Sequence, residues 1–339
     1  MTAWRSAALV LALSFVAAPA AYAADRTLPS SPLFAFEGDD VFESSGLVDR
    51  GRTVYTVNDS GDDAVVYGVD PDTGRTVSRT TYAEEATDVE GLAPGARGTV
   101  WVGDIGDNGR ERDDISVHRV TPRDGEQPAR RYALTYPDSA HDAEALLVHP
   151  RSQQVFVVSK SPFGGTVYAA PRDLGAGRAN RLRPFAQVSG LVTDGSFLPD
   201  GRHVVLRTYG TASVYTFPGF RLVGTVRLPS QRQGEGISVS ARGRVLVSSE
   251  GVQAEVLEVR LPKRLAAPSA AQKAAPSTSI ETPTPTRTPA QAPRDDAGGP
   301  GPAARDTGDW LGIGLVALGV AAIGWLTVRG SRIRSPRDR

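Results

Sequence analysis

Short apolar stretches separated by polar turns fill the chain from residue 30 to residue 262. Five of these stretches are apolar almost throughout, at residues 53–57, 99–102, 155–158, 204–206 and 245–247. Such runs are typical of strands that neighbouring sheets cover on both faces. Each is followed by a strand in which apolar and polar residues alternate, which indicates one buried and one wetter face. The pattern therefore predicts an all-β domain.

A short acidic element precedes each of the five apolar runs. Its clearest form is Asp88-Val89-Glu90-Gly91-Leu92, and related elements lie at residues 43–47, 142–146, 192–196 and 233–237. The third positions of the elements, spaced 45, 54, 50 and 41 residues apart, are Ser45, Glu90, Glu144, Asp194 and Glu235. A repeat of this length is typical of propellers and solenoids. We expect each element to begin the innermost strand of a blade, so that its carboxylates converge on one mouth of a central channel.

The two chain ends predict how the ring closes. A fourth strand ends each of the first four repeats, whereas the fifth stops after residues 255–261 without one. An unassigned strand at residues 33–37 precedes the first repeat and can fill the gap. A blade built from both chain ends closes the ring and leaves no exposed sheet edge. We predict a five-bladed β-propeller over residues 30–262, with four-stranded blades and a last blade completed by the N-terminal strand.

Both ends of the chain also carry the patterns of targeting segments. Residues 1–23 have a weakly basic start, a short apolar run and the cleavage pattern Ala21-Tyr22-Ala23, which predicts a signal peptide. Residues 310–328 contain no charge, and these 19 residues are about enough to cross a bilayer. The positive-inside rule places the basic tail at residues 329–339 in the cytoplasm. We expect a single C-terminal transmembrane helix and a type I cell-membrane protein with an extracellular propeller.

The segment between the propeller and the predicted helix, residues 263–309, is rich in Pro, Thr and Ala. Such sequence cannot bury a core, so we predict a disordered stalk that spaces the propeller from the membrane. Thr307-Gly308, an apolar run and a basic tail also resemble a cell-wall sorting signal, although the Leu-Pro of such signals is absent. Cell-wall attachment is therefore the alternative to a membrane anchor.

Composition limits the classes of partner and chemistry. The chain has 38 Lys and Arg against 38 Asp and Glu, so no overall positive field favours nucleic acid, and we expect no nucleic-acid partner. The absence of cysteine excludes disulfides, cysteine metal sites and a cysteine nucleophile. Neither a G-x-S-x-G elbow nor an H-E-x-x-H motif occurs. The sequence therefore names no catalytic residue.

Polar residues gather where two sets of predicted strand ends meet. The second strand of each blade runs antiparallel to the first, so the start of the first and the end of the second lie on one face of the ring. The predicted ligand-binding residues at this face are Glu43, Asp88, Glu90, Asp142, Glu144, Asp194 and Glu235 at strand starts, with Lys160 and Arg207 at strand ends. Crowded carboxylates need a nearby cation, which a basic residue or a bound metal could supply. In the alternative interpretation the glutamates bond the backbone of the next blade and are structural.

Two loops after second strands combine Asp, Asn and Gly, at residues 58–63 and 104–110. Carboxylate and carbonyl oxygens are the ligands that Ca²⁺ prefers. The predicted metal ligands are Asp59, Asp104, Asp107 and Asn108. Neither loop has the spacing of an EF-hand, and an Asx-turn in a loop between strands would have the same composition.

Three segments of the first two repeats carry a resemblance to a known family. Glu43-Ser44-Ser45-Gly46-Leu47, Val57-Asn58-Asp59 and Asp88-Val89-Glu90-Gly91-Leu92 are similar to the opening of SdiA-regulated and phytase-like β-propeller proteins. Those proteins begin with E-x-S-G-[LI] and continue with D-x-E-G-[LI] one blade later. The similarity, which covers residues 43–110, implies an extracytoplasmic propeller whose acidic channel mouth can bind Ca²⁺. Phytase activity itself would need a cluster of Lys and Arg for the phosphates, and this mouth offers only Arg110, Lys160 and Arg207.

The function expected from these patterns is binding at the cell surface. A well-formed repeat without a recognisable catalytic set favours a membrane-anchored interaction module for an extracellular glycan, small molecule or protein. The alternative is a hydrolase of the glycosidase or phosphoesterase type, in which carboxylates at the channel mouth act as acid and base.

Overall fold

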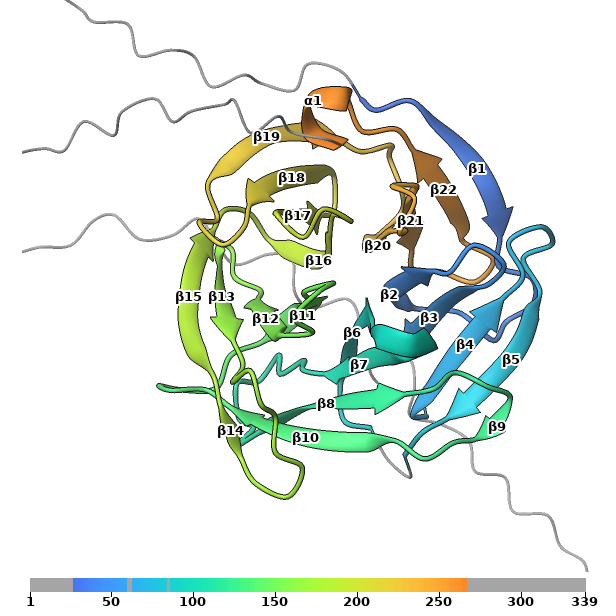
Figure 1. The fold of residues 1–339 in the computed structure, drawn as a ribbon. Coiled ribbons are helices and arrows are strands. Elements are labelled where there is room, and N and C mark those ends of the chain that lie inside the picture. The colour runs from blue at the N-terminus through green and yellow to red at the C-terminus, as the bar shows by residue number, and fades with distance from the viewer. Residues whose placement is uncertain (1–26, 60–62, 84–85, 267–339) are drawn as a thin grey trace, which may run out of the picture. The chain divides into compact units, whose positions relative to one another are not determined.

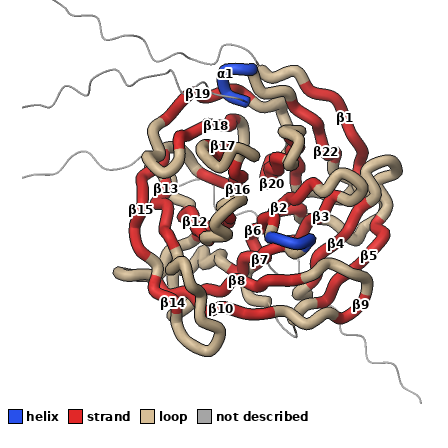
Figure 2. The backbone as a smooth tube through the Cα atoms, viewed as in Figure 1, coloured by secondary structure: helices blue, strands red, loops and turns tan. Residues whose placement is uncertain are grey.

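The computed structural model describes residues 27–59, 63–83 and 86–266, and its strands form five sheets arranged in a ring (Figure 1). Loops join the strands at both ends of the blades (Figure 2). Helix is confined, within these ranges, to the 3₁₀ turn η1 (Ala96–Gly98) and to α1 (Lys263–Ala266). Contacts divide the chain into residues 1–275 and 276–339, and every described residue belongs to the first unit. The predicted all-β, five-bladed propeller is confirmed.

The first four blades are antiparallel sheets whose first strand lies nearest the centre of the ring (Figure 1). The first blade contains β2 (Ser44–Asp49), β3 (Val54–Asn58), β4 (Val65–Val69) and β5 (Thr76–Thr81). The second contains β6 (Val89–Pro94), β7 (Val100–Asp104), β8 (Ile115–Val120) and β10 (Arg130–Thr135). The third contains β11 (Ala143–Val148), β12 (Val155–Ser159), β13 (Gly165–Ala169) and β15 (Arg183–Val188). The fourth contains β16 (Val192–Phe197), β17 (His203–Thr208), β18 (Thr211–Thr216) and β19 (Leu222–Arg227).

The fifth blade joins the two ends of the propeller. It contains β20 (Gly234–Val239), β21 (Val245–Ser249), β22 (Glu255–Val259) and, as its outer strand, β1 (Ser30–Ala35). The pairing of β1 with β22 runs from Ser30 opposite Val259 to Ala35 opposite Glu255. The N-terminal strand therefore closes the ring as predicted, although it occupies residues 30–35 rather than 33–37.

Two blades have one more strand than the sequence predicts. The two-residue strands β9 (Gly125–Glu126) and β14 (Asn180–Arg181) pair in parallel with β5 and β10. Each belongs to the long connection before the outer strand of the following blade, and there it lies along the edge of the preceding blade. The extra strands cover sheet edges that would otherwise present unpaired backbone groups.

The core consists of five apolar clusters, one at each interface between neighbouring blades. Strand β7 explains why the second strands read as continuous apolar runs. Its residues Val100 and Val102 pack against the first blade, whereas Trp101 between them packs against the third. Both faces of a second strand are thus buried, as the pattern predicted.

The glycine of the acidic element has a structural role. A Cβ atom on Gly46 would lie 2.3 Å from the backbone nitrogen of Leu92, and one on Gly91 would lie 2.7 Å from Cβ of Leu146. These distances are too short for a side chain, because neighbouring inner strands approach closely around the ring.

The predicted signal peptide at residues 1–23, transmembrane helix at 310–328 and basic tail at 329–339 lie outside the described residues. Within the described ranges no helix is long and apolar enough to span a membrane. The first four residues of the segment predicted as a stalk form α1, whose Leu265 is buried in the cluster between blades four and five. The folded unit therefore continues to Ala266, while residues 267–309 are not described.

Candidate functional site

The first two strands of every blade share one feature of register. The last residue of each second strand pairs with the first residue of the inner strand, in the pairs Ser44–Asn58, Val89–Asp104, Ala143–Ser159, Val192–Thr208 and Gly234–Ser249. The register shifts directly after each of these pairs. A β-bulge turns the side chain of the extra residue away from its regular direction. The starts of the inner strands and the ends of the second strands therefore meet at one face, as predicted, which we call the acidic end.

The bulges identify the equivalent residues of the five blades. The residues within the shifts include Ser45, Glu90, Glu144, Thr193 and Glu235. Ser45 Oγ donates to the carbonyl of Glu90 at 2.9 Å, and Thr193 Oγ1 donates to the carbonyl of Glu235 at 3.1 Å. Three blades thus offer a carboxylate at this position and two offer a hydroxyl that bonds to the next blade.

The prediction that Asp194 belongs to this set is wrong by one residue. In blade four the shift falls between Val192 and Asp194, so Thr193 is the equivalent of Glu90. The Asp194 side chain is fully buried, and its Oδ2 accepts the N–H of Ile237 at 2.7 Å. Burial raises the pKa of Asp194 well above its ordinary value. The residue joins blades four and five and is not placed to contact a ligand.

The prediction of Arg207 as a ligand-binding residue is also wrong, because its side chain is fully buried. The guanidinium donates from Nη1 to the carbonyls of Gly236 at 2.5 Å and Ser248 at 2.8 Å, and from Nη2 to Gln231 Oε1 at 2.7 Å. Burial lowers the pKa of Arg207 to about 10. Its guanidinium N–H donors are thus occupied by oxygen atoms at the interface between the fourth and fifth blades.

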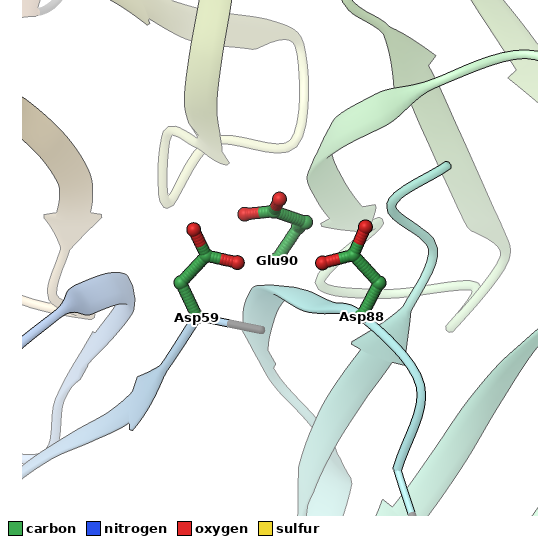
Figure 3. A group of neighbouring side chains, drawn as sticks. All are labelled: Asp59, Asp88 and Glu90. Atoms are coloured by element: carbon green, nitrogen blue, oxygen red, sulfur yellow. The ribbon is translucent and has the colours of Figure 1, made fainter. Parts of the chain in front are cut away.

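Three carboxylates from the first two blades converge at the acidic end. Asp59 follows β3, Asp88 precedes β6 and Glu90 lies on β6 (Figure 3). One carboxylate oxygen from each residue lies within 4.8 Å of the other two. Asp88 and Glu90 are 9% and 3% exposed. Ser45 Oγ donates to Glu90 Oε2 at 3.0 Å, whereas Asp88 Oδ1 is buried and has no hydrogen-bond partner among the described residues. We call these three residues the acidic triad.

Burial and neighbouring carboxylates act on the pKa values of two triad residues. Burial, and then the carboxylates of Asp59 and Asp142, raise the pKa of Asp88 to about 7 against the opposing effect of Arg112. Burial, then Glu144 and Asp59, raise the pKa of Glu90 well above its ordinary value. Carboxylates in this situation are stabilised by a proton or by a cation, so the triad can hold a metal ion.

The glycine after β7 allows Asp88 to reach its position. A Cβ atom on Gly106 would lie 2.4 Å from Cγ of Asp88 and 2.9 Å from Cγ of Glu90. The backbone N–H of Gly106 also donates to the Asp88 carbonyl at 3.1 Å. The loop after β7 therefore shapes the triad through its backbone.

The third and fifth blades add an ion pair and a further carboxylate. Lys160 Nζ lies 2.5 Å from Glu144 Oε1 and 5.8 Å from the centroid of the Tyr209 ring. Burial lowers the pKa of Lys160, but the Glu144 carboxylate more than offsets this and holds it above its ordinary value. Burial raises the pKa of Glu235 to about 7 against the opposing effects of Lys160 and Arg207. Glu235 Oε2 has no hydrogen-bond partner among the described residues.

The remaining predicted ligand-binding residues lie at the edge of the same end. Asp142 Oδ1 accepts the N–H of Asp107 at 3.0 Å, which gives this carboxylate a structural bond. Glu43 is half-buried, and its carbonyl accepts the N–H of Asp59 at 2.9 Å. Glu250 lies at a predicted second-strand end but was not among the predicted ligand-binding residues, and burial, then Glu235 and Asp59, raise its pKa to about 7. Its place directly after β21, like that of Asp59 after β3, was the available signal.

Only Asp59 of the four predicted metal ligands joins the triad. Asp104 Oδ1 accepts the N–H of Asp88 at 3.0 Å and Arg112 Nη1 at 2.8 Å. The two carboxylate oxygens of Asp107 accept the N–H groups of Glu111 at 2.9 Å and Arg112 at 3.0 Å, and Asn108 is exposed. These bonds fix the loop after β7 as the turn interpretation expects, and the metal assignment of Asp104, Asp107 and Asn108 stays a prediction.

Comparison with known proteins adds little beyond the fold. No protein-family model and no curated protein sequence matches the chain. Among solved structures, a gluconolactonase from Xanthomonas campestris is 19% identical with a TM-score of 0.41, over 64% of this chain and 72% of its own. A glucose dehydrogenase is 10% identical with a TM-score of 0.44, over 69% and 99%. A luciferin-regenerating enzyme is 12% identical with a TM-score of 0.41, over 69% and 95%.

Proposed function

We propose that the acidic end binds Ca²⁺ and that the protein is a calcium-dependent binding module. The observation that carries this proposal is the acidic triad. One carboxylate oxygen from each of its residues lies within 4.8 Å of the other two, and the buried Asp88 Oδ1 lacks a partner among the described residues. Ca²⁺ prefers carboxylate and carbonyl oxygens and accepts irregular arrangements of them. A bound ion would also offset the cost of burying several like charges. The resemblance to SdiA-regulated and phytase-like propellers points the same way.

The ligand of this module would bind through the ion. Three carboxylates supply only part of the roughly six to eight oxygens that surround Ca²⁺, so hydroxyl or carboxylate groups of a ligand can complete the shell. Lys160 and Tyr209 lie beside the site, and Tyr209 is 38% exposed. Phe163, in the same connection as Lys160, is fully exposed. A cation and two aromatic rings suit a glycan, a small molecule or a peptide segment as the extracellular ligand.

The direct test is calcium binding by the full chain. The protein is treated with EDTA, exchanged into metal-free buffer and titrated with CaCl₂ in a calorimeter, and untreated protein is analysed for metal content. We expect about one bound ion with a Kd of roughly 10⁻⁵ to 10⁻³ M, and a higher Tm with Ca²⁺ than with EDTA. Melting curves that coincide in the two buffers, without saturable heat, would refute the proposal.

A hydrolase is the second candidate, and one observation favours it. Asp88 and Glu235 have pKa values of about 7, so at neutral pH each divides between acid and carboxylate. Such groups can act as general acid beside an ionised base. Turnover of chromogenic glycosides, phosphoesters or lactones that is lost in the Glu235→Gln variant would establish this function. Inactivity toward all three classes would leave the binding module.

We also propose that the propeller is displayed on the cell surface as a type I membrane protein. Residues 1–23, 263–309 and 310–328 support this through the patterns of a signal peptide, a spacer and a membrane span. N-terminal sequencing of the mature chain should then begin at Ala24. Protease added to intact cells should release the propeller. A mature chain that begins at Met1 and resists protease would contradict the proposal.

A further inference from the structure

A cavity lies at the other end of the ring, on the side opposite the acidic triad. The hairpins between the first and second strands of all five blades line it, and its volume is about 990 Å³. The hairpins must lie opposite the acidic end, because each inner strand starts at the acidic end and runs away from it. The size suits a small molecule, since ligand pockets span roughly 300 to 1,000 Å³.

Arginine gathers on one side of this cavity, which we call the basic end. Arg50 and Arg52 come from the β2–β3 hairpin, and Arg242 and Arg244 come from β20–β21. The first and fifth blades are neighbours, because β2 packs beside β20. Asp49 is the only acidic residue that lines the cavity within the described part of the chain.

The single acidic side chain is already neutralised. Arg244 donates from Nε to Asp49 Oδ2 and from Nη2 to Asp49 Oδ1, both at 2.7 Å. The Asp49 side chain is 0% exposed in this bidentate pair. Three of the four arginines therefore have no opposite charge in the cavity wall. Such a wall attracts anions.

One of these three arginines is held in place and two are accessible. Arg50 Nη2 donates to the carbonyls of Gly95 at 2.8 Å and Thr99 at 2.7 Å, which ties the first blade to the second. Arg52 and Arg242 are exposed and form no ion pair with any described residue. Their guanidinium donors are thus available to a ligand.

The opposite side of the cavity is mainly apolar, with Gln153 as its polar side chain. The third and fourth blades contribute Val148, Pro150, Phe197, Leu198 and Pro199. The Phe197 ring packs against Phe217, with ring centroids 5.0 Å apart, and against His149 at 5.1 Å. This support makes the apolar wall a fixed surface, so the cavity has one cationic and one apolar side.

We propose that the basic end binds a small amphipathic anion, a phosphate or carboxylate group attached to an apolar ring or chain. The anionic group contacts Arg52 and Arg242, since planar guanidinium groups match both oxyanions. The apolar body lies against Pro150 and Pro199, the exposed apolar residues of that side, where its burial contributes to affinity. This site is separate from the acidic triad and needs no metal.

Four probe molecules test the two halves of this recognition by calorimetry on the full chain. Phenyl phosphate and phenylacetate carry both an anion and a ring, inorganic phosphate carries the anion alone, and benzyl alcohol carries the ring alone. We expect one or both of the first two to bind at least about tenfold more tightly than the last two. The preferred anion distinguishes a phosphate ligand from a carboxylate. The proposal would be overturned if neither aromatic anion bound more tightly than inorganic phosphate and benzyl alcohol, or if neither showed saturable binding.

Charge reversal with a matched control tests the arginines. The double variant Arg52→Glu/Arg242→Glu should lose at least about tenfold in affinity for the better probe. The control Arg183→Glu/Arg227→Glu makes the same change of charge on the exposed outer strands β15 and β19, and should change affinity less than about twofold. An equal loss of affinity in both variants would show that the net charge of the protein causes the effect, and would refute the site. Should the first variant fail to fold, Arg52→Gln/Arg242→Gln replaces it with the same expectation.

A chelator separates this site from the acidic end. Addition of EDTA should leave the affinity for the aromatic anion unchanged, because no residue of the acidic triad lines the cavity. Binding that disappears with EDTA would assign the probe to the acidic end and contradict the proposal. Failure of calcium binding at the triad would not affect this test.

Discussion

At its acidic end the ring places carboxylates on bulged strand starts, where burial leaves Asp88 and Glu235 with partnerless oxygens among the described residues. At its basic end it places arginines on hairpin tips, where Arg52 and Arg242 remain exposed. The same strands connect the two ends, and their apolar middle residues serve only packing. The comparison shows that the polar residues suited to binding lie at the ends of the strands in both cases. They are buried at the acidic end and exposed at the basic end. Changes at the acidic end should therefore alter stability and metal binding together, whereas changes at the basic end should alter binding alone.

The largest expected effect is loss of calcium binding when the triad is neutralised. In Asp88→Asn/Glu90→Gln two of three anionic ligands become neutral amides, so the Ca²⁺ affinity measured by calorimetry should fall more than about 100-fold, or more than roughly 2.7 kcal/mol. The control Asp72→Asn/Glu126→Gln removes the same charge at exposed positions and should leave affinity within about twofold. Affinity for the aromatic anion should not change. An equal loss at both ends would contradict their independence.

The second prediction concerns the pH dependence of stability without calcium. The folded-state pKa values of Asp88 and Glu235 are raised to about 7, above the values of an unfolded chain. Such groups stabilise the fold fully below their unfolded pKa, and this stabilisation is lost as pH rises through about 7. In EDTA the Tm should therefore fall by roughly 5–10 °C between pH 5 and pH 8. Saturating Ca²⁺ should remove the part of this fall that comes from Asp88 in the triad. A flat profile in EDTA would show that burial does not raise the pKa values of these carboxyl groups.

The third prediction tests the ion pair between Lys160 and Glu144. Lys160→Met removes the ammonium that lies 2.5 Å from the Glu144 carboxylate and leaves that buried carboxyl without its cation. We expect the free energy of unfolding in urea to fall by about 2–3 kcal/mol at pH 8, with a smaller loss at pH 5. Lys160→Met/Glu144→Gln should recover most of the loss, because no unpaired charge remains. A single variant as stable as the parent would mean that the pair contributes nothing.

Much of the fold could be predicted from the sequence, because blade repetition leaves periodic signals. Apolar runs predicted second strands that are buried on both faces. The missing fourth strand of the last repeat predicted closure by a strand at residues 33–37, and β1 closes the ring at residues 30–35. The edge strands β9 and β14 carry no such signal, since two residues in a long connection have no pattern of their own.

The candidate site was harder to predict, because register decides it. In the sequence comparison of the repeats, Asp194 was the acidic residue nearest to the position of Glu90 and was aligned with it. The β-bulge of the fourth blade places Thr193 at that position instead. Composition suggested that the loop after β7 binds metal, whereas Asp104 and Asp107 bond to backbone N–H groups. Asp59 and Asp88 belong to two different blades, and their spacing along the chain does not predict that their carboxylates lie close together. Arginine residues in hairpin turns are common, so the sequence alone does not mark them as a site. Only the structure shows that five hairpins line one cavity.

The smallest expected effect comes from a residue of the acidic end that carries no charge. In Gly106→Ala the added Cβ atom would lie 2.4 Å from Cγ of Asp88. Because this distance is too short, the Asp88 carboxylate must move away from the triad. Calcium affinity should fall about tenfold, which is roughly 1.4 kcal/mol, while the aromatic anion should bind unchanged. Gly210→Ala is the control, because nothing lies within 4 Å of its added Cβ atom. If calcium affinity survives Gly106→Ala but not Asp88→Asn/Glu90→Gln, the charges of the triad matter more than their exact placement. If it survives neither, the backbone of the loop after β7 is part of the site, and the acidic end differs from the basic end in geometry as well as in charge.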